Sequence, residues 1–164
     1  MTERPGLELP PVTDEYRHRT TVQVRFRDID AFGHVNNAVF FSYVELARIR
    51  YLLDVLQPVT RFDRLPLILA RVELDFRSPI EFGEDVTVAT RVERIGHTSF
   101  AMRHRMIAGA QDRLAGDVQT VLVTYDYTTA RPIPVPAEWR ARIGEHEGRT
   151  FEPDAAHPAT AAAG

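Results

Sequence analysis

The segment AVFFSYVELARIRYLLDVL, residues 38–56, limits the possible folds more than any other part of the sequence. It contains neither Gly nor Pro, and a first set of apolar residues recurs at helical spacing: Phe40, Val44, Ala47, Tyr51 and Val55. A second set widens the apolar surface beyond one face: Phe41, Tyr43, Leu46 and Leu52. Such a pattern is typical of a helix that other structure covers on most sides. Asn36 or Asn37 is the expected N-cap of this helix.

Alternating apolar and polar residues predict five strands, one before this helix and four after it. In the first strand, which starts at Thr20, we expect Val22, Val24 and Phe26 to share the buried face. The last strand is the long alternating run AGDVQTVLVTYDYT. The sequence therefore predicts an α+β fold in which a five-stranded antiparallel sheet wraps around one long central helix.

The two ends of the chain are expected to lie outside this domain. Residues 1–17 are rich in Pro, Glu and Arg without periodicity, which indicates a flexible lead-in. The domain itself is predicted over residues 18–131. Residues 132–164 form a C-terminal extension, with a short helix around residues 138–143 and an unstructured tail from about Gly144.

Composition excludes several classes of function. The formal charge of −3 argues against nucleic-acid binding, which needs a basic surface. The chain has no Cys, and all twenty of its Lys and Arg residues are Arg, so thiol, disulfide and Schiff-base chemistry are absent. No HExxH, G-x-S-x-G or phosphate-binding glycine motif occurs. With no signal peptide and no apolar run near the ~20 residues that span a bilayer, we expect a cytoplasmic protein without membrane contact.

The motif that carries chemistry lies between the first strand and the long helix. It reads D-x-D-x-x-G-H-V-N-N, and the helix that follows contains E-x-A-R, here Glu45, Ala47 and Arg48. The stretch VRFRDIDAFGHVNNAVFFSYVELARIRYL resembles the hotdog-fold acyl-CoA thioesterases, in their 4-hydroxybenzoyl-CoA thioesterase-like branch. The resemblance extends over roughly residues 20–130 and includes FRSPIEFGEDV and GHTSF. It implies a hotdog fold and hydrolysis of a thioester to a free acid and CoA.

The resemblance also implies roles for individual residues. Asp30 would act as general base or nucleophile, and the backbone amide of Asn37 at the helix N-terminus would polarise the thioester carbonyl. The implied substrate-binding residues surround these two: Gly33, His34, Val35, Asn36, Phe40 and Ser99. Asp28 is expected to form a turn or cap, and Glu45 to pair with Arg48 or a strand arginine. Neither a metal nor another cofactor is expected.

The expected partners follow from the same resemblance. The substrate would be an acyl-CoA or an acyl-carrier-protein thioester, and four strand arginines are candidates for the CoA phosphates: Arg71, Arg77, Arg103 and Arg105. We expect a homodimer or homotetramer, with sheets joined edge to edge and each site between protomers. Two other functions stay open: an enoyl-thioester hydratase or dehydratase, whose usual Asp and His spacing is poorly matched, and a non-catalytic acyl-thioester binding domain.

Overall fold

The computed structural model describes residues 14–57 and 65–152. Its elements in chain order are β1 (His18–Gln23), the short 3-10 helix η1 (Phe26–Asp28), α1 (Asn37–Val55), β2 (Leu67–Phe76), β3 (Asp85–Ile95), β4 (Ser99–Ala108), β5 (Arg113–Asp126), β6 (Arg131–Pro132) and α2 (Ala137–Glu147). The strands pair antiparallel in the order β1-β3-β4-β5-β2, and the short β6 pairs with β5. The predicted five strands and central helix are confirmed, with β6 and the longer α2 as additions.

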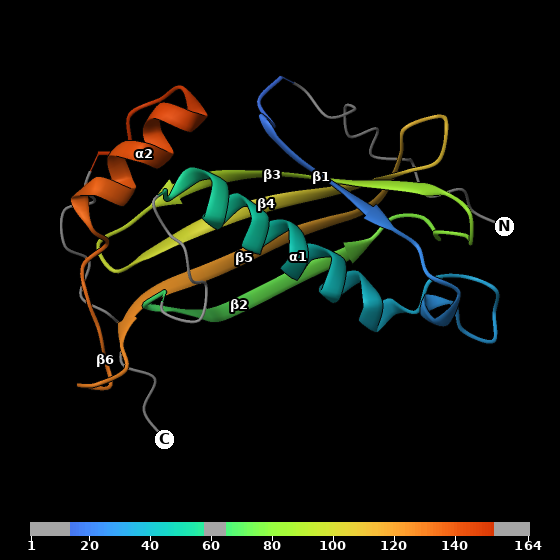
Figure 1. Ribbon diagram of the computed structural model, residues 1–164, viewed down its shortest axis with the longest axis horizontal. Helices are drawn as coiled ribbons and strands as arrows, with labels where there is room; N and C mark the ends of the chain where they lie inside the picture. The colour runs from blue at the N-terminus through green and yellow to red at the C-terminus, as the bar shows by residue number, and fades with distance from the viewer. Residues whose placement is uncertain (1–13, 58–64, 153–164) are drawn as a thin grey trace, which may run out of the picture.

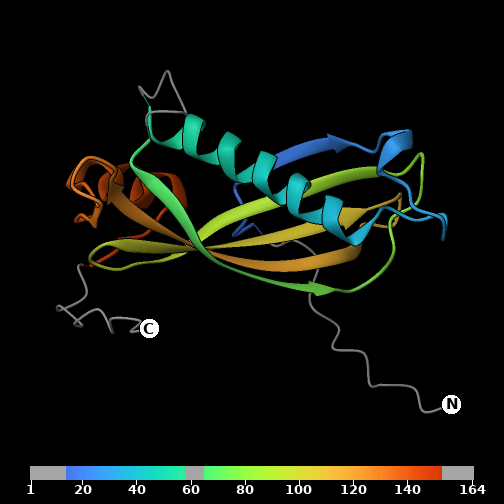
Figure 2. The ribbon, with the colours of Figure 1, turned by 90° about the horizontal axis from the view of Figure 1, so that it is seen from below.

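Helix α1 crosses one face of the sheet, and the sheet curves around it (Figures 1 and 2). All five residues predicted at helical spacing are buried, as are Tyr43 and Leu52. The apolar core has two parts: one surrounds the first half of α1, from Phe40 to Ala47, and the other surrounds Tyr51 to Leu56. The buried residues of α1 therefore lie along its whole length but on the one face that meets the sheet. Phe41 and Leu46 of the second set are 46% and 40% exposed, so the expectation that other structure covers the helix on most sides was wrong.

A layer of buried polar side chains lies between these two parts of the core. His104 is fully buried in β4, where its ring nitrogens contact the hydroxyls of Thr90 on β3 and Thr120 on β5, each at 3.0 Å. Burial, reinforced by the charge of Arg48 on α1, lowers the pKa of His104 to about 3. The imidazole is therefore neutral at physiological pH and links three neighbouring strands.

The first strand ends earlier than its alternation predicts. β1 stops at Gln23, and the chain then turns into η1, so Phe26 is 81% exposed instead of buried beside Val22 and Val24. The cause is Asp28, whose carboxylate accepts hydrogen bonds from the backbone amide and the guanidinium of Arg25 and pulls the chain into a turn. The prediction for Phe26 was wrong because a local side-chain bond overrides alternation here.

The C-terminal extension packs against the domain. Helix α2 runs to Glu147, whose carboxylate accepts hydrogen bonds from the hydroxyl of Tyr51 on α1 and from the amide of Val92 on β3. Further along, Phe151 is buried in the second part of the core. An unstructured tail from Gly144 is therefore wrong for residues 144–152, while residues 1–13 and 153–164 of the predicted flexible ends lie outside the described residues. No helix within the described ranges has the length and apolarity needed to span a membrane.

Candidate active site

The two aspartates of the D-I-D motif occupy different environments. Asp28 is only 3% exposed, and its Oδ2 accepts hydrogen bonds from the amide of Arg25 at 2.9 Å and from the hydroxyl of Tyr43 at 2.8 Å. Burial alone would raise the pKa of Asp28, but the hydrogen bonds from Arg25 and Tyr43 outweigh it and keep the pKa below its ordinary value. Asp28 is thus an ionised anchor that joins the loop to α1, which fits the structural role predicted for it.

Asp30 is only partly buried and has a free oxygen. Its Oδ1 accepts a hydrogen bond from the amide of Phe32 at 2.8 Å, and within the described residues Oδ2 accepts none. The turn that holds it is closed by hydrogen bonds from the Asp30 amide to the His34 carbonyl and from the Gly33 amide to the Asp30 carbonyl. Gly33 has φ +82°, a left-handed conformation that glycine adopts at little cost. The backbone therefore fixes the direction of the Asp30 carboxylate.

The loop then passes directly into the N-terminus of α1. Asn36 is the N-cap, and its side chain accepts a hydrogen bond from the amide of Ala38 at 2.9 Å, while its carbonyl accepts from Val39. The amide of Asn37, the first residue of the helix, has no acceptor among the described residues. Because the helix dipole places partial positive charge at this end, the Asn37 amide can donate to an oxygen that carries developing negative charge.

These groups meet in a cleft of about 480 Å³ between the loop and the end of β2. Ten residues line it: Asp30, Phe32, His34, Val35, Asn37, Phe40, Phe76, Arg77, Ser78 and Pro79. A carboxylate with a free oxygen and an uncapped helix amide thus face one space. The carboxylate can take a proton from a water that attacks a carbonyl carbon, or attack that carbon itself, while the amide stabilises the carbonyl oxygen.

Most of the predicted site residues come together in this cleft. Gly33 and Asn36 do not line it but shape the backbone on which the lining residues lie. Ser99 begins β4 beside the β3–β4 turn, pairs with Val123, and does not line the cleft of its own chain, so its predicted substrate-binding role stays a prediction. Sequence reasoning did not single out Phe32, although its neighbours in the motif were chosen.

The end of β2 was the other part of the cleft that sequence reasoning missed. Phe76, Ser78 and Pro79 belong to the FRSPIEF stretch, whose likeness to the family was the available signal. A backbone hydrogen bond from Val35 to the Ile80 carbonyl holds this stretch against the loop. The cleft therefore joins two segments that lie about forty residues apart in the sequence.

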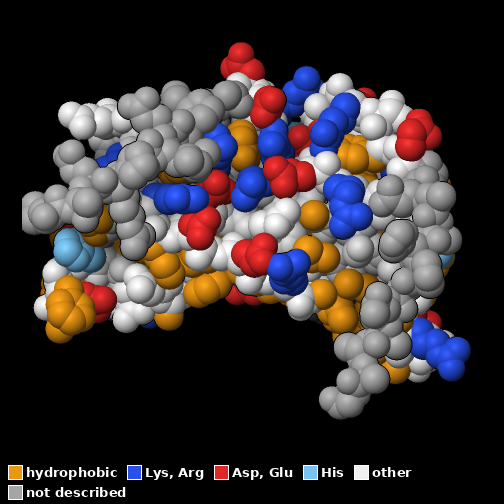
Figure 3. All heavy atoms as spheres, turned by 180° about the vertical axis from the view of Figure 1, so that it is seen from behind, with side chains coloured by type: hydrophobic (Ala, Val, Ile, Leu, Met, Phe, Trp, Pro, Cys, Tyr) orange, Lys and Arg blue, Asp and Glu red, His pale blue; other side chains and the backbone are white. Residues whose placement is uncertain are grey.

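The four candidate arginines are not gathered around the cleft. Arg77 lines it, with its guanidinium 3.0 Å from the carboxylate of Asp75. The other three alternate along their strands with neighbours that pack on the core, and so point away from α1: Arg71, Arg103 and Arg105. Figure 3 shows arginine and acidic side chains interleaved on that face of the sheet. Glu45 contacts the buried Arg48 at 3.5 Å, as predicted.

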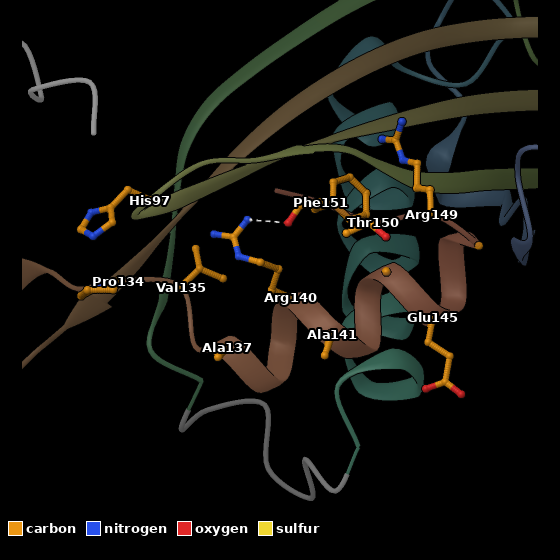
Figure 4. Close-up of a pocket in the computed structure, with 12 residues that line it drawn as sticks. His97, Pro134, Val135, Ala137, Arg140, Ala141, Glu145, Arg149, Thr150 and Phe151 are labelled. Atoms are coloured by element: carbon orange, nitrogen blue, oxygen red, sulfur yellow. Dashed lines mark hydrogen bonds between the residues drawn. The ribbon is translucent and has the colours of Figure 1, made fainter. Parts of the chain in front are cut away.

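A larger cavity lies elsewhere. It has a volume of about 770 Å³, is open to solvent, and is lined by α2, the segments before and after α2, and the β3–β4 turn (Figure 4). Arg140 extends from α2 to the carbonyls of Ile95 and Gly96, at 3.1 and 2.7 Å, so its guanidinium fastens the helix to the turn. The one acidic residue among those lining the cavity, Glu145, points away from it. This cavity is larger than the cleft at Asp30, but it does not combine an inward-facing carboxylate with a helix N-terminus as that cleft does.

Comparison with known proteins identifies the fold and its chemistry. The model of the thioesterase-like superfamily matches residues 24–143, which include the whole cleft. The chain belongs to this superfamily. A thioesterase from Thermus thermophilus, solved in complex with coenzyme A and Zn, is 40% identical to this chain, with a TM-score of 0.76 over 85% of this chain and 100% of the other.

More distant relatives agree with this assignment. The long-chain acyl-CoA thioesterase FadM of Escherichia coli is 20% identical over 127 residues, which are 76% of this chain and 96% of FadM. A 1,4-dihydroxy-2-naphthoyl-CoA thioesterase from Synechocystis, 19% identical, shares the fold with a TM-score of 0.70 over 86% of this chain and 98% of its own. The protein is a thioester hydrolase with the hotdog fold. The hydratase and the non-catalytic binding domain have no support from these comparisons.

A resident metal site is not evident in the described residues. No group of three or more His, Asp or Glu side chains there is arranged to hold a metal ion. Among the polar groups of the cleft, the Asp30 carboxylate and the Asn37 backbone amide suit an organic carbonyl substrate.

Proposed function

We propose that the enzyme hydrolyses an acyl-CoA to a free acid and CoA, with Asp30 and the Asn37 amide as its catalytic groups. The observation that carries the proposal is the shared cleft in which the free oxygen of Asp30 and the uncapped amide of Asn37 lie at the N-terminus of α1. The match to acyl-CoA thioesterases supports CoA as the carrier.

The reaction needs one base or nucleophile and one donor to the carbonyl oxygen. In the general-base route, Asp30 takes a proton from water as the water oxygen bonds to the thioester carbon, and the Asn37 amide stabilises the resulting oxyanion. The C–S bond then breaks, and the CoA thiolate leaves and takes up a proton. In the nucleophilic route, the Asp30 carboxylate itself bonds to the thioester carbon, the C–S bond breaks as the CoA thiolate leaves and takes up a proton, and water hydrolyses the resulting mixed anhydride to the free acid and the Asp30 carboxylate. Neither route uses the Asn37 side chain.

A thiol-release assay with a panel of acyl-CoAs tests the proposal. The Asp30→Asn variant preserves the acceptor for the Phe32 amide and removes only the carboxylate, so the rate should fall by about two orders of magnitude or more. Asn37→Ala is the matched control, because it leaves the backbone amide in place and should lower the rate only mildly. Wild-type rates for Asp30→Asn would disprove the assignment. Incorporation of one ¹⁸O from labelled water into Asp30 in a single turnover would select the nucleophilic route.

We further propose that two chains assemble through their β2 strands and complete each other's clefts. β2 is a terminal strand of the sheet that, within the described part of the chain, pairs with β5 alone, and it exposes Leu69 and Phe76. An exposed edge of this kind favours pairing with a second copy. Phe76 lies both at this edge and in the cleft, so a partner strand would lie beside the site. Sedimentation of a monomer at micromolar concentration would contradict this assembly.

A further inference from the structure

Two phenylalanines near the cleft have side chains that are largely exposed to solvent. Phe26 of η1 is 81% exposed, and Phe82, between β2 and β3, is 60% exposed. Their ring centroids lie 6.0 Å apart with the planes at 90°. Neither ring packs into the two parts of the core, so burial within the chain does not explain them. We refer to Phe26 and Phe82 as the aromatic pair.

The residue that follows Phe26 in the chain is an arginine whose guanidinium has no partner among the described residues. Arg27 follows Phe26 in η1, is exposed, and forms no ion pair or side-chain hydrogen bond in the described part of the chain. The other cations nearby are already engaged. Arg25 binds the carboxylate of Asp28, and Arg113 binds both carboxylate oxygens of Glu84 at 3.0 Å. Arg77 in the cleft is likewise engaged, with Asp75 at 3.0 Å. Arg27, next to Phe26 in η1, is thus an exposed cation that is available to an anionic ligand.

The aromatic pair lies within reach of the catalytic cleft. Phe82 is three residues beyond Pro79, which lines the cleft, and three residues span at most about 10 Å. Its neighbour Glu81 forms an isolated bridge with His34, another lining residue. A ligand that leaves the cleft at this end would therefore meet the aromatic pair and Arg27 next.

We propose that the aromatic pair and Arg27 bind the nucleotide end of the substrate, 3′-phosphoadenosine diphosphate, with adenine stacked on one of the two exposed rings, the edge of the other ring beside it, and a phosphate on the guanidinium. The inference rests on the proposed acyl-CoA function. An exposed aromatic face binds nucleobases by stacking, and arginine binds phosphate with two parallel hydrogen bonds. The flexible pantetheine arm would connect this site to the thioester in the cleft.

The combination of groups favours a nucleotide over other occupants. A protein interface of stable size needs about 800 Å² on each side, far more than two rings and one arginine supply. A membrane surface would be met by a larger cluster of basic residues. A planar base with attached phosphates matches both the number and the kind of groups present.

The test compares an acyl-CoA with the S-acyl-pantetheine of the same acyl group, which lacks the nucleotide. The Phe26→Ser, Phe82→Ser double variant and Arg27→Gln should each raise KM for the acyl-CoA by about tenfold or more, with kcat unchanged. Rates with the S-acyl-pantetheine should stay at the wild-type value. Arg19→Gln is the matched control, because Arg19 on β1 is also exposed and unpaired among the described residues. It should leave both substrates unaffected.

Several outcomes would overturn the inference while the proposed function stands. These are an unchanged KM for the acyl-CoA in the variants, or wild-type kcat/KM values that are equal for the two substrates. A loss confined to an acyl-carrier-protein thioester would assign the aromatic pair to protein docking and also overturn it. If the wild type hydrolysed neither small substrate, the proposed function would fail. Calorimetric titration with adenosine 3′,5′-bisphosphate would still decide the inference, because binding must occur in the wild type and be lost in the double variant.

Discussion

Replacing each aspartate of the D-I-D motif with asparagine should separate stability from catalysis. Asp28 is 3% exposed, and its Oδ2 accepts the buried hydrogen bond from Tyr43 as well as bonds from Arg25. In asparagine, an NH₂ group replaces one carboxylate oxygen and the negative charge is lost. This group is a donor and cannot accept the hydrogen bonds of Arg25 and Tyr43. Hydrogen bonds to charged groups contribute roughly 1.5–3 kcal/mol each, less where a partner such as Arg25 is half exposed. We therefore expect Asp28→Asn to lower the free energy of unfolding by about 2 kcal/mol.

The matching change at Asp30 should leave stability almost unchanged. Its single hydrogen bond, from the Phe32 amide, persists with an asparagine oxygen, and its other oxygen has no partner to lose among the described residues. The free energy of unfolding should change by no more than about 0.5 kcal/mol. In contrast, hydrolysis should fall by about two orders of magnitude or more.

Two measurements on each variant test this crossover. Urea unfolding followed by circular dichroism gives stability, and thermal melting of Asp28→Asn should shift downward by about 4–8 °C for a chain of this size. Thiol release gives activity, with no background because the protein has no Cys. The reasoning fails if Asp30→Asn destabilises the protein as much as Asp28→Asn. It also fails if folded Asp28→Asn loses activity and Asp30→Asn does not.

Three further predictions concern the core, the turn and the helix cap. The pKa of His104 is near 6.5 in the unfolded chain and about 3 in the folded chain, so unfolding takes up a proton between these pH values. The free energy of unfolding therefore falls as the pH is lowered through this range, by about 1.4 kcal/mol per pH unit. Urea titrations at pH 6.5 and 4.5 should differ by about 2–3 kcal/mol more in the wild type than in His104→Gln. Gly33→Ala should cost about 1 kcal/mol through its φ of +82° alone, because an added Cβ meets no atom within 4 Å; a loss above 3 kcal/mol would indicate a clash. Asn36→Ala removes the N-cap and should cost about 1 kcal/mol in thermal melts, whereas Asn36→Asp should not.

Much of the fold was predictable because it follows from patterns that repeat along the chain. The helical spacing from Phe40 to Val55 and the two-residue alternation of β3, β4 and β5 each report burial at many positions at once. The errors occurred where one side chain decides the conformation. Asp28 ends β1 early and exposes Phe26, and the contact of Glu147 with Tyr51 orders a helix that composition alone would leave short.

The candidate site divides in the same way. Asp30, the turn at Gly33 and the amide of Asn37 are neighbours in sequence, so a local motif was sufficient to bring them together. Phe76 comes from a strand about forty residues away, and only the antiparallel pairing of β2 with β5 and the bond from Val35 to Ile80 place it in the cleft. Such contacts depend on register and loop geometry, which a single sequence does not specify.

The two roles of the D-I-D motif explain how the loop keeps reactive groups unpaired. A carboxylate oxygen and a helix amide without partners are unfavourable in a folded chain, because nearby donors would normally pair with the oxygen and nearby acceptors with the amide. Here Asp28 and Asn36 take up the available donors, from Arg25, Tyr43 and Ala38, and their bonds fix the backbone on both sides. The chain turns between the two aspartates, because η1 ends at Asp28. Asp28 therefore faces α1 while Asp30 lines the cleft. The stability of the loop is thereby concentrated in groups that do no chemistry, which leaves Asp30 and the Asn37 amide free for a substrate.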